Sequence, residues 1–327
     1  DVYKRQILTV LKALFYIAFV GFAGLLGVDV AKHKEDLQKT SGSDKAKLAG
    51  IGFITNFGDT LGIGSFGPIV ALLNALKVNI NDRIIPGTLN VSCTLPVLFE
   101  AILFTSAVEM DALTLALMIA AAVIGSYLGA GVISRMDERK IQKVMGIALF
   151  IAATIMLITH PYFGLFEMQN DATGFRGIKL IVAIIGNFIL GALMSAGVGL
   201  YAPCMAMVSL LGMNIKLAFP IMMGSCALLM PAGSVKFIKE GAYDRTAAVL
   251  INILGLLGVV AAYWGVKNAN IDILKFVIIA VIYYTAYTMI KKSKAPRATE
   301  TVTTTETTTT RKVDDEVVDS KEVYESK

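Results

Sequence analysis

The fold is decided by two glycine-rich breaks in long apolar runs, Gly62-Ile63-Gly64-Ser65-Phe66-Gly67-Pro68 and Gly197-Val198-Gly199-Leu200-Tyr201-Ala202-Pro203. A shift of 135 positions aligns the two breaks, and from residue 62 to residue 80 it matches seven identical residues: Gly62, Gly64, Pro68, Ala71, Leu76, Asn79 and Ile80. A hydrophobic segment that is interrupted at corresponding positions of two halves indicates a transporter binding site. We therefore expect an internally repeated membrane protein with its site at the breaks.

The composition is that of a membrane protein. Hydrophobic residues make up 55% of the chain and charged residues 17%, and the mean hydropathy is +0.67. A soluble domain carries roughly 25% charged residues. Several apolar runs exceed about 18 residues, the length at which a helix crosses a bilayer. We expect an all-α polytopic membrane protein in the bacterial cytoplasmic membrane.

The apolar runs divide the chain into four parts. Helical segments are expected at about 7–28, 48–76, 85–108, 112–133, 141–159, 179–212, 217–237, 246–266 and 272–290. Residues 1–47 hold one extra N-terminal span and a basic cytoplasmic loop, and residues 1–6 resemble translated adapter sequence. Residues 48–160 form repeat 1 and residues 179–290 form repeat 2. Residues 293–327 are rich in Thr and Glu and poor in core-forming residues, so we expect a disordered cytoplasmic tail.

The placement of Lys and Arg predicts that the repeats are inverted. Loops 29–47, 134–143 and 236–245 and the stretch after 290 are basic, which assigns them to the cytoplasm. Loops 29–47 and 134–143 lie on the same side of the membrane only if residues 48–76 enter the membrane and return to that side as two half-length helices. Each repeat is then a broken (re-entrant-like) helix pair plus three spans. Because three crossings are an odd number, the second repeat starts on the opposite face.

Several motifs resemble those of the sulfite exporter TauE/SafE family of membrane permeases, over about residues 48–290. One is the glycine-rich break that ends in a proline, repeated in the second half; another is the glycine-rich span Gly125–Met136, which leads into a basic loop, and Lys140 to Gly146 continues the match. Bulkier residues replace the family's usual glycines at the breaks, namely Ser65, Phe66, Leu200 and Tyr201. The resemblance implies export of sulfite or an organosulfur anion.

The breaks predict an anion site that needs no fixed cation. The second half-helix of each pair is expected to begin near Ser65 or Leu200, where free backbone N–H groups and the helix dipole favour an anion. Proline fits the first turn, and glycine allows close approach and positive φ. The expected substrate-binding residues of the breaks are Gly62, Gly64, Ser65, Gly67, Pro68, Gly197, Gly199, Tyr201 and Pro203. The alternative interpretation is that the glycines only allow close helix packing.

Polar side chains and thiols at membrane depth extend the predicted site. The amide and hydroxyl candidates are Asn56, Asn90, Ser195 and Ser225. Each of them can instead bond to neighbouring backbone. The thiol candidates are Cys93, Cys204 and Cys226, which donate weak hydrogen bonds to an oxyanion in one interpretation and pack as small apolar residues in the other.

Two intramembrane carboxyl groups are candidates for coupling, because an ionisable side chain is costly in a bilayer and marks function by default. Asp59 lies three residues before Gly62. It carries a coupling proton, helps to hold Na⁺ with carbonyls of the break, or caps the following half-helix. Glu100 lies in the middle of segment 85–108, where it couples transport or pairs with a neighbouring helix.

Together these features predict a secondary transporter rather than an enzyme. We expect a permease that moves a small anion, sulfite or an organosulfur anion, across the lipid bilayer by alternating access, with H⁺ or Na⁺ as coupling ion. An anion channel or uniporter is the alternative. An intramembrane enzyme is disfavoured because the chain has no HExxH or GxSxG motif and no histidine at membrane depth. No cofactor, no metal and no nucleic-acid partner is expected, and the sequence leaves the oligomeric state open.

Overall fold

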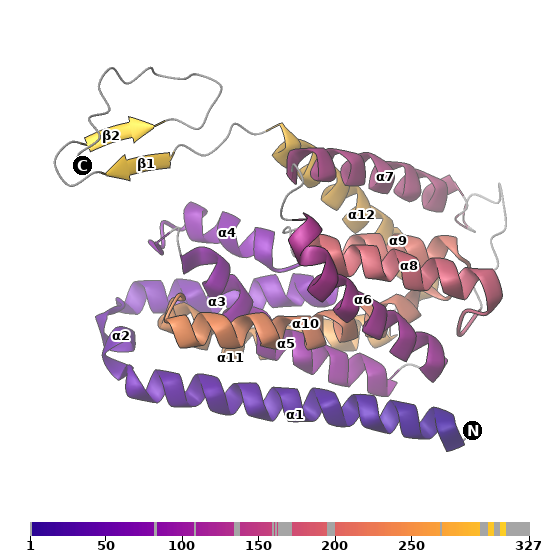
Figure 1. Cartoon of the computed structure of the whole chain (residues 1–327), viewed down its shortest axis with the longest axis horizontal. Helices are drawn as coiled ribbons and strands as arrows, with labels where there is room; N and C mark the ends of the chain where they lie inside the picture. Colours follow the sequence, from indigo (N-terminus) through magenta and orange to yellow (C-terminus); the bar gives the residue numbers. More distant parts are fainter. Residues whose placement is uncertain are drawn as a thin grey trace, which may run out of the picture.

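The computed structural model describes residues 2–81, 84–107, 109–133, 138–158, 160, 162, 172–194, 200–268, 270–294, 300–303 and 308–311. These residues form a bundle of helices that run side by side along its length (Figure 1). The helices are α1 (Val2–Lys32), α2 (Lys34–Lys39), α3 (Gly42–Thr60), α4 (Phe66–Ala75), α5 (Ile85–Ala107), α6 (Ala112–Ile133), α7 (Glu138–Ile158), α8 (Gly177–Met194), α9 (Tyr201–Leu210), α10 (Ala218–Glu240), α11 (Arg245–Asn268) and α12 (Ile271–Ser293).

Five helical stretches of the described residues are long and apolar enough to cross a membrane: Arg5–Lys32, Gly87–Ser106, Gly177–Met194, Ile215–Glu240 and Arg245–Gly265. Shorter apolar helices accompany them, at Phe66–Ala75, Ala112–Leu128, Gln142–Ile158 and Tyr201–Leu210. The prediction of an all-α polytopic membrane protein is therefore confirmed.

The first long segment is broken where the sequence predicts, and in the second segment α9 begins next to Leu200, as expected. Helix α3 gives way to α4 across Gly62 and Gly64, whose φ angles are +92° and +82°. Only glycine adopts such left-handed backbone readily. Pro68 and Pro203 are the third residues of α4 and α9, inside the first turn as expected. Each half-helix has 10 residues, about 15 Å, which is half of a bilayer's hydrocarbon thickness.

The two halves of the chain interlock. Helix α3 packs along α11, and α8 packs along α6. The first helix of each predicted broken pair therefore packs against a span of the other half. Backbones meet closely at both crossings: a Cβ atom at Gly258 would lie 2.3 Å from the Phe53 carbonyl oxygen, and one at Gly125 would lie 2.0 Å from that of Phe188. Phe53 and Phe188 differ by 135 positions, the shift that aligns the breaks. These matched contacts support the inverted-repeat interpretation, which stays a prediction.

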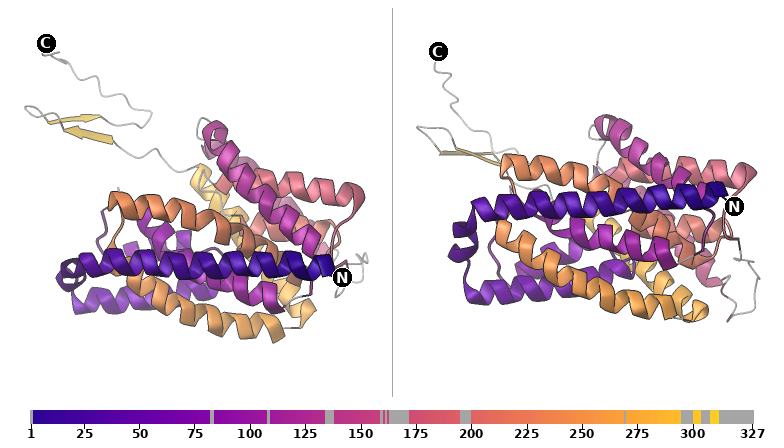
Figure 2. Two further views of the ribbon diagram at one scale, coloured as in Figure 1. Left: turned by 60° about the horizontal axis from the view of Figure 1, so that its bottom comes forward. Right: turned by 90° about the horizontal axis from the view of Figure 1, so that it is seen from below.

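Helix α1 lies along the outside of the bundle (Figure 2) and packs on α5, α6 and α10. One face of α1 is buried, at Leu11, Phe15, Phe22 and Leu26. The opposite face exposes Val10, Leu14, Ile17 and Val20. A peripheral helix with one apolar face toward protein and another apolar face outward fits a span that borders on lipid. Its placement supports the interpretation of α1 as a span outside the two repeats.

A polar network joins the last turns of α1 and the short helix α2 to the turn between α10 and α11 and to the first residue of α11. The Asp29 carboxylate accepts hydrogen bonds from the Tyr243 hydroxyl (2.6 Å) and from Arg245 Nε (2.8 Å). Arg245 also binds Asp36 at 3.0 Å. Loops 29–47 and 236–245 therefore lie at the same end of the bundle, as the charge pattern predicts. The assignment of that end to the cytoplasm stays a prediction.

Two short strands follow the last helix. Strands β1 (Glu300–Thr303) and β2 (Thr308–Arg311) pair antiparallel as a hairpin. The hairpin stands apart from the helices in every view (Figures 1 and 2). It lies within the segment whose composition predicts disorder, and that prediction stays open for the tail.

Candidate functional site

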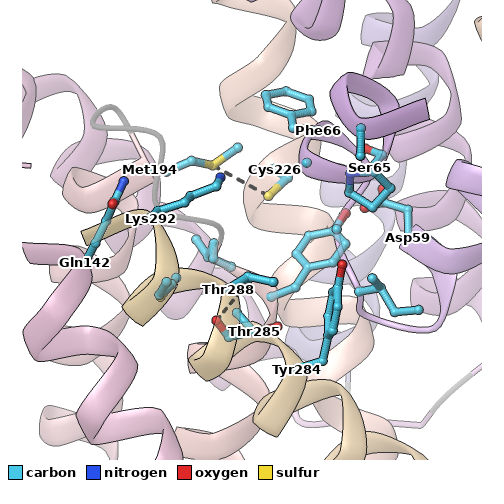
Figure 3. Close-up of a pocket in the computed structure, with 18 of the residues that line it drawn as sticks. Asp59, Ser65, Phe66, Gln142, Met194, Cys226, Tyr284, Thr285, Thr288 and Lys292 are labelled. Carbon is cyan, nitrogen blue, oxygen red and sulfur yellow. Dashed lines mark hydrogen bonds between the residues drawn. The ribbon is translucent and has the colours of Figure 1, made fainter. Parts of the chain in front are cut away.

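A cavity of about 370 Å³ lies between the two breaks (Figure 3). Its lining comes from both breaks and from α5, α7, α8, α10 and α12. Seven of the predicted site residues line it: Asp59, Gly64, Ser65, Gly67, Pro68, Tyr201 and Cys226. The two breaks, 135 positions apart in the sequence, thus contribute to one cavity.

Two buried carboxyl groups lie at this part of the bundle: Asp59 lines the cavity, and Glu100 is buried behind the lining. Glu100 of α5 is fully buried, and its carboxyl oxygens lie 2.6 Å from Thr60 Oγ1 and 3.3 Å from the Tyr201 hydroxyl. Asp59, which is 3% exposed, has Ser65 and Tyr201 as polar side-chain neighbours. Neither carboxyl group forms an ion pair within the described part of the chain. Tyr201 therefore links the second break to both acidic groups of the first half.

Sulfur-containing side chains form another part of the lining. Cys226 donates a hydrogen bond to Met194, with an Sγ to Sδ distance of 3.7 Å (Figure 3). Met230 and Met289 also line the cavity. Thioethers are apolar, polarisable and flexible, so this wall adapts its shape to an occupant without offering it charge.

Helix α12 supplies a wall of the cavity that the sequence interpretation missed. Tyr284, Thr285, Thr288 and Lys292 lie on the cavity side of this helix (Figure 3). Gln142 of α7 lines the cavity near Lys292. The available signal was the spacing of the polar residues, which recur every three or four positions along one face of an otherwise apolar span.

Several predicted site residues bond to protein instead of lining the cavity. Asn56 donates to the Gly52 carbonyl at 2.8 Å, which is the backbone alternative for this amide. The Asn90 side-chain amide oxygen accepts a hydrogen bond from the Ser234 hydroxyl at 3.1 Å. Ser225 donates to the Ile221 carbonyl at 2.7 Å.

The remaining predicted residues are packed or lie outside the description. Gly62 is buried against the side chain of Met205. Cys93, Cys204 and Pro203 are buried in α5 and α9. Ser195, Gly197 and Gly199 lie outside the described residues. Among the residues that the structure describes, no cluster of three His, Cys, Asp or Glu side chains suits a metal ion.

The two half-helices are buried to different extents. Helix α9 has eight of its 10 residues buried, whereas α4 has only Ile69 and Leu73 buried. The start of α4 lines the cavity at Phe66, Gly67 and Pro68. The two breaks are thus similar in sequence but unequal in packing in this conformation.

The fold and the cavity define a polytopic α-helical membrane protein with an acidic site between two broken helices. Residues 5–156 match the family model described as Sulfite exporter TauE/SafE, which confirms the resemblance seen in the sequence. The match includes α1, which the sequence interpretation set apart, and it ends before the second half of the chain. Comparison with curated proteins gave no match, and comparison with solved structures gave none. The matched family is described as one of sulfite exporters, and the match covers less than half of the chain.

Proposed function

We propose that this protein is a secondary transporter that moves sulfite or an organosulfur anion across the membrane by alternating access, coupled to protons. The observation that carries the proposal is the carboxyl pair of Asp59 and Glu100, which has Tyr201 of the second break beside it and hydrogen-bonded to Glu100. A pair of acidic groups buried without a cation marks a proton relay more readily than a structural contact.

The breaks supply the anion-binding groups. Helix α4 begins at Phe66, so the backbone N–H groups of its first turn lack helical partners. Phe66 and Gly67 line the cavity, and Gly67 brings no side chain between backbone and ligand. Free N–H groups and the positive end of a helix dipole replace part of the hydration that an anion loses.

The hydrogen bonds of Thr60 support a proton on the carboxyl pair. Thr60 Oγ1 lies 2.9 Å from the Asn56 carbonyl and 2.6 Å from Glu100 Oε1. A hydroxyl group has one proton to donate. If that proton goes to Asn56, Glu100 must supply the proton of the second contact. Two neighbouring carboxyl groups without a counter-charge also disfavour double ionisation. H⁺ is therefore favoured over Na⁺ as the coupling ion.

The unequal packing of α4 and α9 supports alternating access. Two elements with matching sequence are expected to exchange environments when a repeated transporter changes its open face. In this conformation α9 is packed and α4 borders the cavity. Since Tyr201 opens α9 and contacts Glu100, movement of α9 changes the surroundings of the carboxyl pair. This contact couples protonation to the conformational change.

The test is sulfite flux into proteoliposomes that contain the purified full chain, with and without a pH gradient. We expect the gradient to drive wild-type flux, and Asp59→Asn and Glu100→Gln to abolish the response to the gradient. Asp44→Asn is the matched control, because Asp44 pairs with Lys47 at 2.9 Å, away from the cavity. Wild-type flux that ignores the gradient contradicts proton coupling. A lack of flux for sulfite and for organosulfonates contradicts the transport proposal itself.

A further inference from the structure

Two lysines at the mouth of the cavity take no part in the function proposed above. Lys291 and Lys292 lie in the last turn of α12, and both line the cavity. Figure 3 shows the Lys292 side chain between Gln142 and Met194, across the cavity from Asp59. Its ammonium group thus points toward the space that an occupant would fill.

Helix α12 presents Lys292 on the same face as its other cavity residues. Thr288 and Thr285 precede Lys292 by about one and two helical turns. Thr288 donates its hydroxyl proton to the Thr285 carbonyl, and Thr285 donates to Val281, both at 2.9 Å. These hydroxyl groups therefore offer acceptor oxygens toward the cavity. On this wall, the groups that can donate protons to an anion are the two lysines and the Tyr284 hydroxyl, and only the lysines bring a positive charge.

The charges of the cavity favour a cation beside an anionic occupant, in addition to the backbone N–H groups of the break. Among the described residues that line it, the charged side chains are those of Asp59, Lys291 and Lys292. An ionised carboxyl group repels an anion strongly within apolar walls. An ammonium group on the opposite wall offsets this repulsion. Its flexible stem and three donors suit a ligand that moves through the cavity.

We propose that Lys292 is the residue that recruits the anionic group of the substrate and holds it at the mouth of the cavity. The ligand class is an oxyanion, a sulfite or sulfonate group here, because the inference rests on the proposed function. Lysines at a helix C-terminus also complement the helix dipole and mark the cytoplasmic end of a span. That role accounts for a basic last turn, but it does not require a side chain directed into the cavity.

The test combines calorimetric titration with sulfite and sulfite flux in proteoliposomes, both on the full chain and at low and high salt. Lys292→Gln removes the charge, and Lys292→Arg keeps it. Lys294→Gln is the matched control, because Lys294 is exposed near the same helix end and does not line the cavity. We expect Lys292→Gln to raise Kd and KM roughly tenfold or more, the effect of one charge-assisted hydrogen bond. It should also weaken the salt dependence of binding, while maximal flux changes less.

The outcomes separate this inference from the proposed function. Near wild-type binding by Lys292→Arg and Lys294→Gln, together with weak binding by Lys292→Gln, supports it. Equal binding by wild type and Lys292→Gln overturns it, as does an equal loss in Lys294→Gln. If the wild-type protein binds sulfite but does not move it, the transport proposal is contradicted and the titration still decides the role of Lys292. A wild-type protein that neither binds nor moves sulfite overturns both for this anion.

Discussion

Replacing Gly125 of α6 by alanine forces two helices apart at the crossing of α6 and α8. The added Cβ atom would lie 2.0 Å from the Phe188 carbonyl oxygen, short of the ordinary van der Waals range, which starts at 3.4 Å, by about 1.4 Å. The neighbouring atoms belong to backbone, so no side-chain rotation relieves the contact. In Gly258→Ala, the added Cβ atom would likewise lie too close to backbone, 2.3 Å from the Phe53 carbonyl oxygen.

The magnitude follows from two opposing effects. Overpacking costs about 1–3 kcal/mol, and separating the helices weakens dispersion along the whole crossing. Alanine gains about 1 kcal/mol over glycine in helix propensity. Gly50→Ala in α3 isolates the second effect, because nothing lies within 4 Å of its new Cβ atom. Relative to Gly50→Ala, we therefore expect Gly125→Ala and Gly258→Ala each to lose about 1–3 kcal/mol of stability.

The assay is thermal unfolding of the three variants in one detergent at one scan rate, because membrane proteins often unfold irreversibly. A loss of 1 kcal/mol corresponds to roughly 2–4 °C for chains of 150–250 residues. We expect Gly125→Ala to melt several degrees below Gly50→Ala, with Gly258→Ala close to it. If Gly125→Ala melts at or above the temperature of Gly50→Ala, the close crossing is wrong. If only one crossing variant is destabilised, the equivalence of the two halves is contradicted.

Two further predictions concern single polar contacts outside the cavity. Arg176 donates two hydrogen bonds to Asp111, at 2.8 and 2.9 Å, and these hold the pKa of the Asp111 carboxyl group well below its ordinary value. A carboxyl group with a lowered folded-state pKa stabilises the fold above its unfolded-state value, near pH 4, and loses this contribution as the pH falls. Arg176→Gln should therefore lower the melting temperature at pH 7, and the difference from wild type should shrink in acid; a difference that is constant with pH contradicts this. The Asn252 amide bridges the Leu95 N–H (3.1 Å) and the Val91 carbonyl (2.9 Å) of α5, so Asn252→Leu should lose about 1–3 kcal/mol in thermal unfolding, and an unchanged melting temperature contradicts the bridge.

The helices could be predicted from the sequence because membrane spans depend on long apolar runs. The residues at which the helices begin were harder to predict. The apolar run of the first broken segment begins at residue 48, but α3 begins at Gly42. The reason is the Ser41 hydroxyl, which accepts a hydrogen bond from the Asp44 N–H at 3.1 Å and caps the helix. Hydropathy registers only the part of the helix that enters lipid, whereas capping decides where the backbone begins to coil.

From the sequence, the candidate site could be predicted only at the breaks, where the backbone conformation requires particular residue types. Glycine and proline mark the breaks because few other residues adopt those conformations. The contact between Tyr201 and Glu100 joins residues 101 positions apart and leaves no pattern in either segment. In the sequence, Lys292 looks like one of the basic residues that mark the cytoplasmic end of a span. Where its side chain points depends on how α12 packs, which the sequence does not show. Contacts between distant helices therefore required the structure.

The exchange of partners between the halves has a consequence for biogenesis. Helix α3 packs along α11, which begins about 200 residues later in the chain. During synthesis, the α3 surface that carries Gly52 stays without its final packing partner until the segment with Ile251, its neighbour in the finished bundle, has been inserted. Domains otherwise tend to fold from the N-terminus as they are made. Here a nascent first half has no lasting partner for its broken helix, so two co-expressed halves should assemble with each other, and either half alone should be a substrate for quality-control proteases.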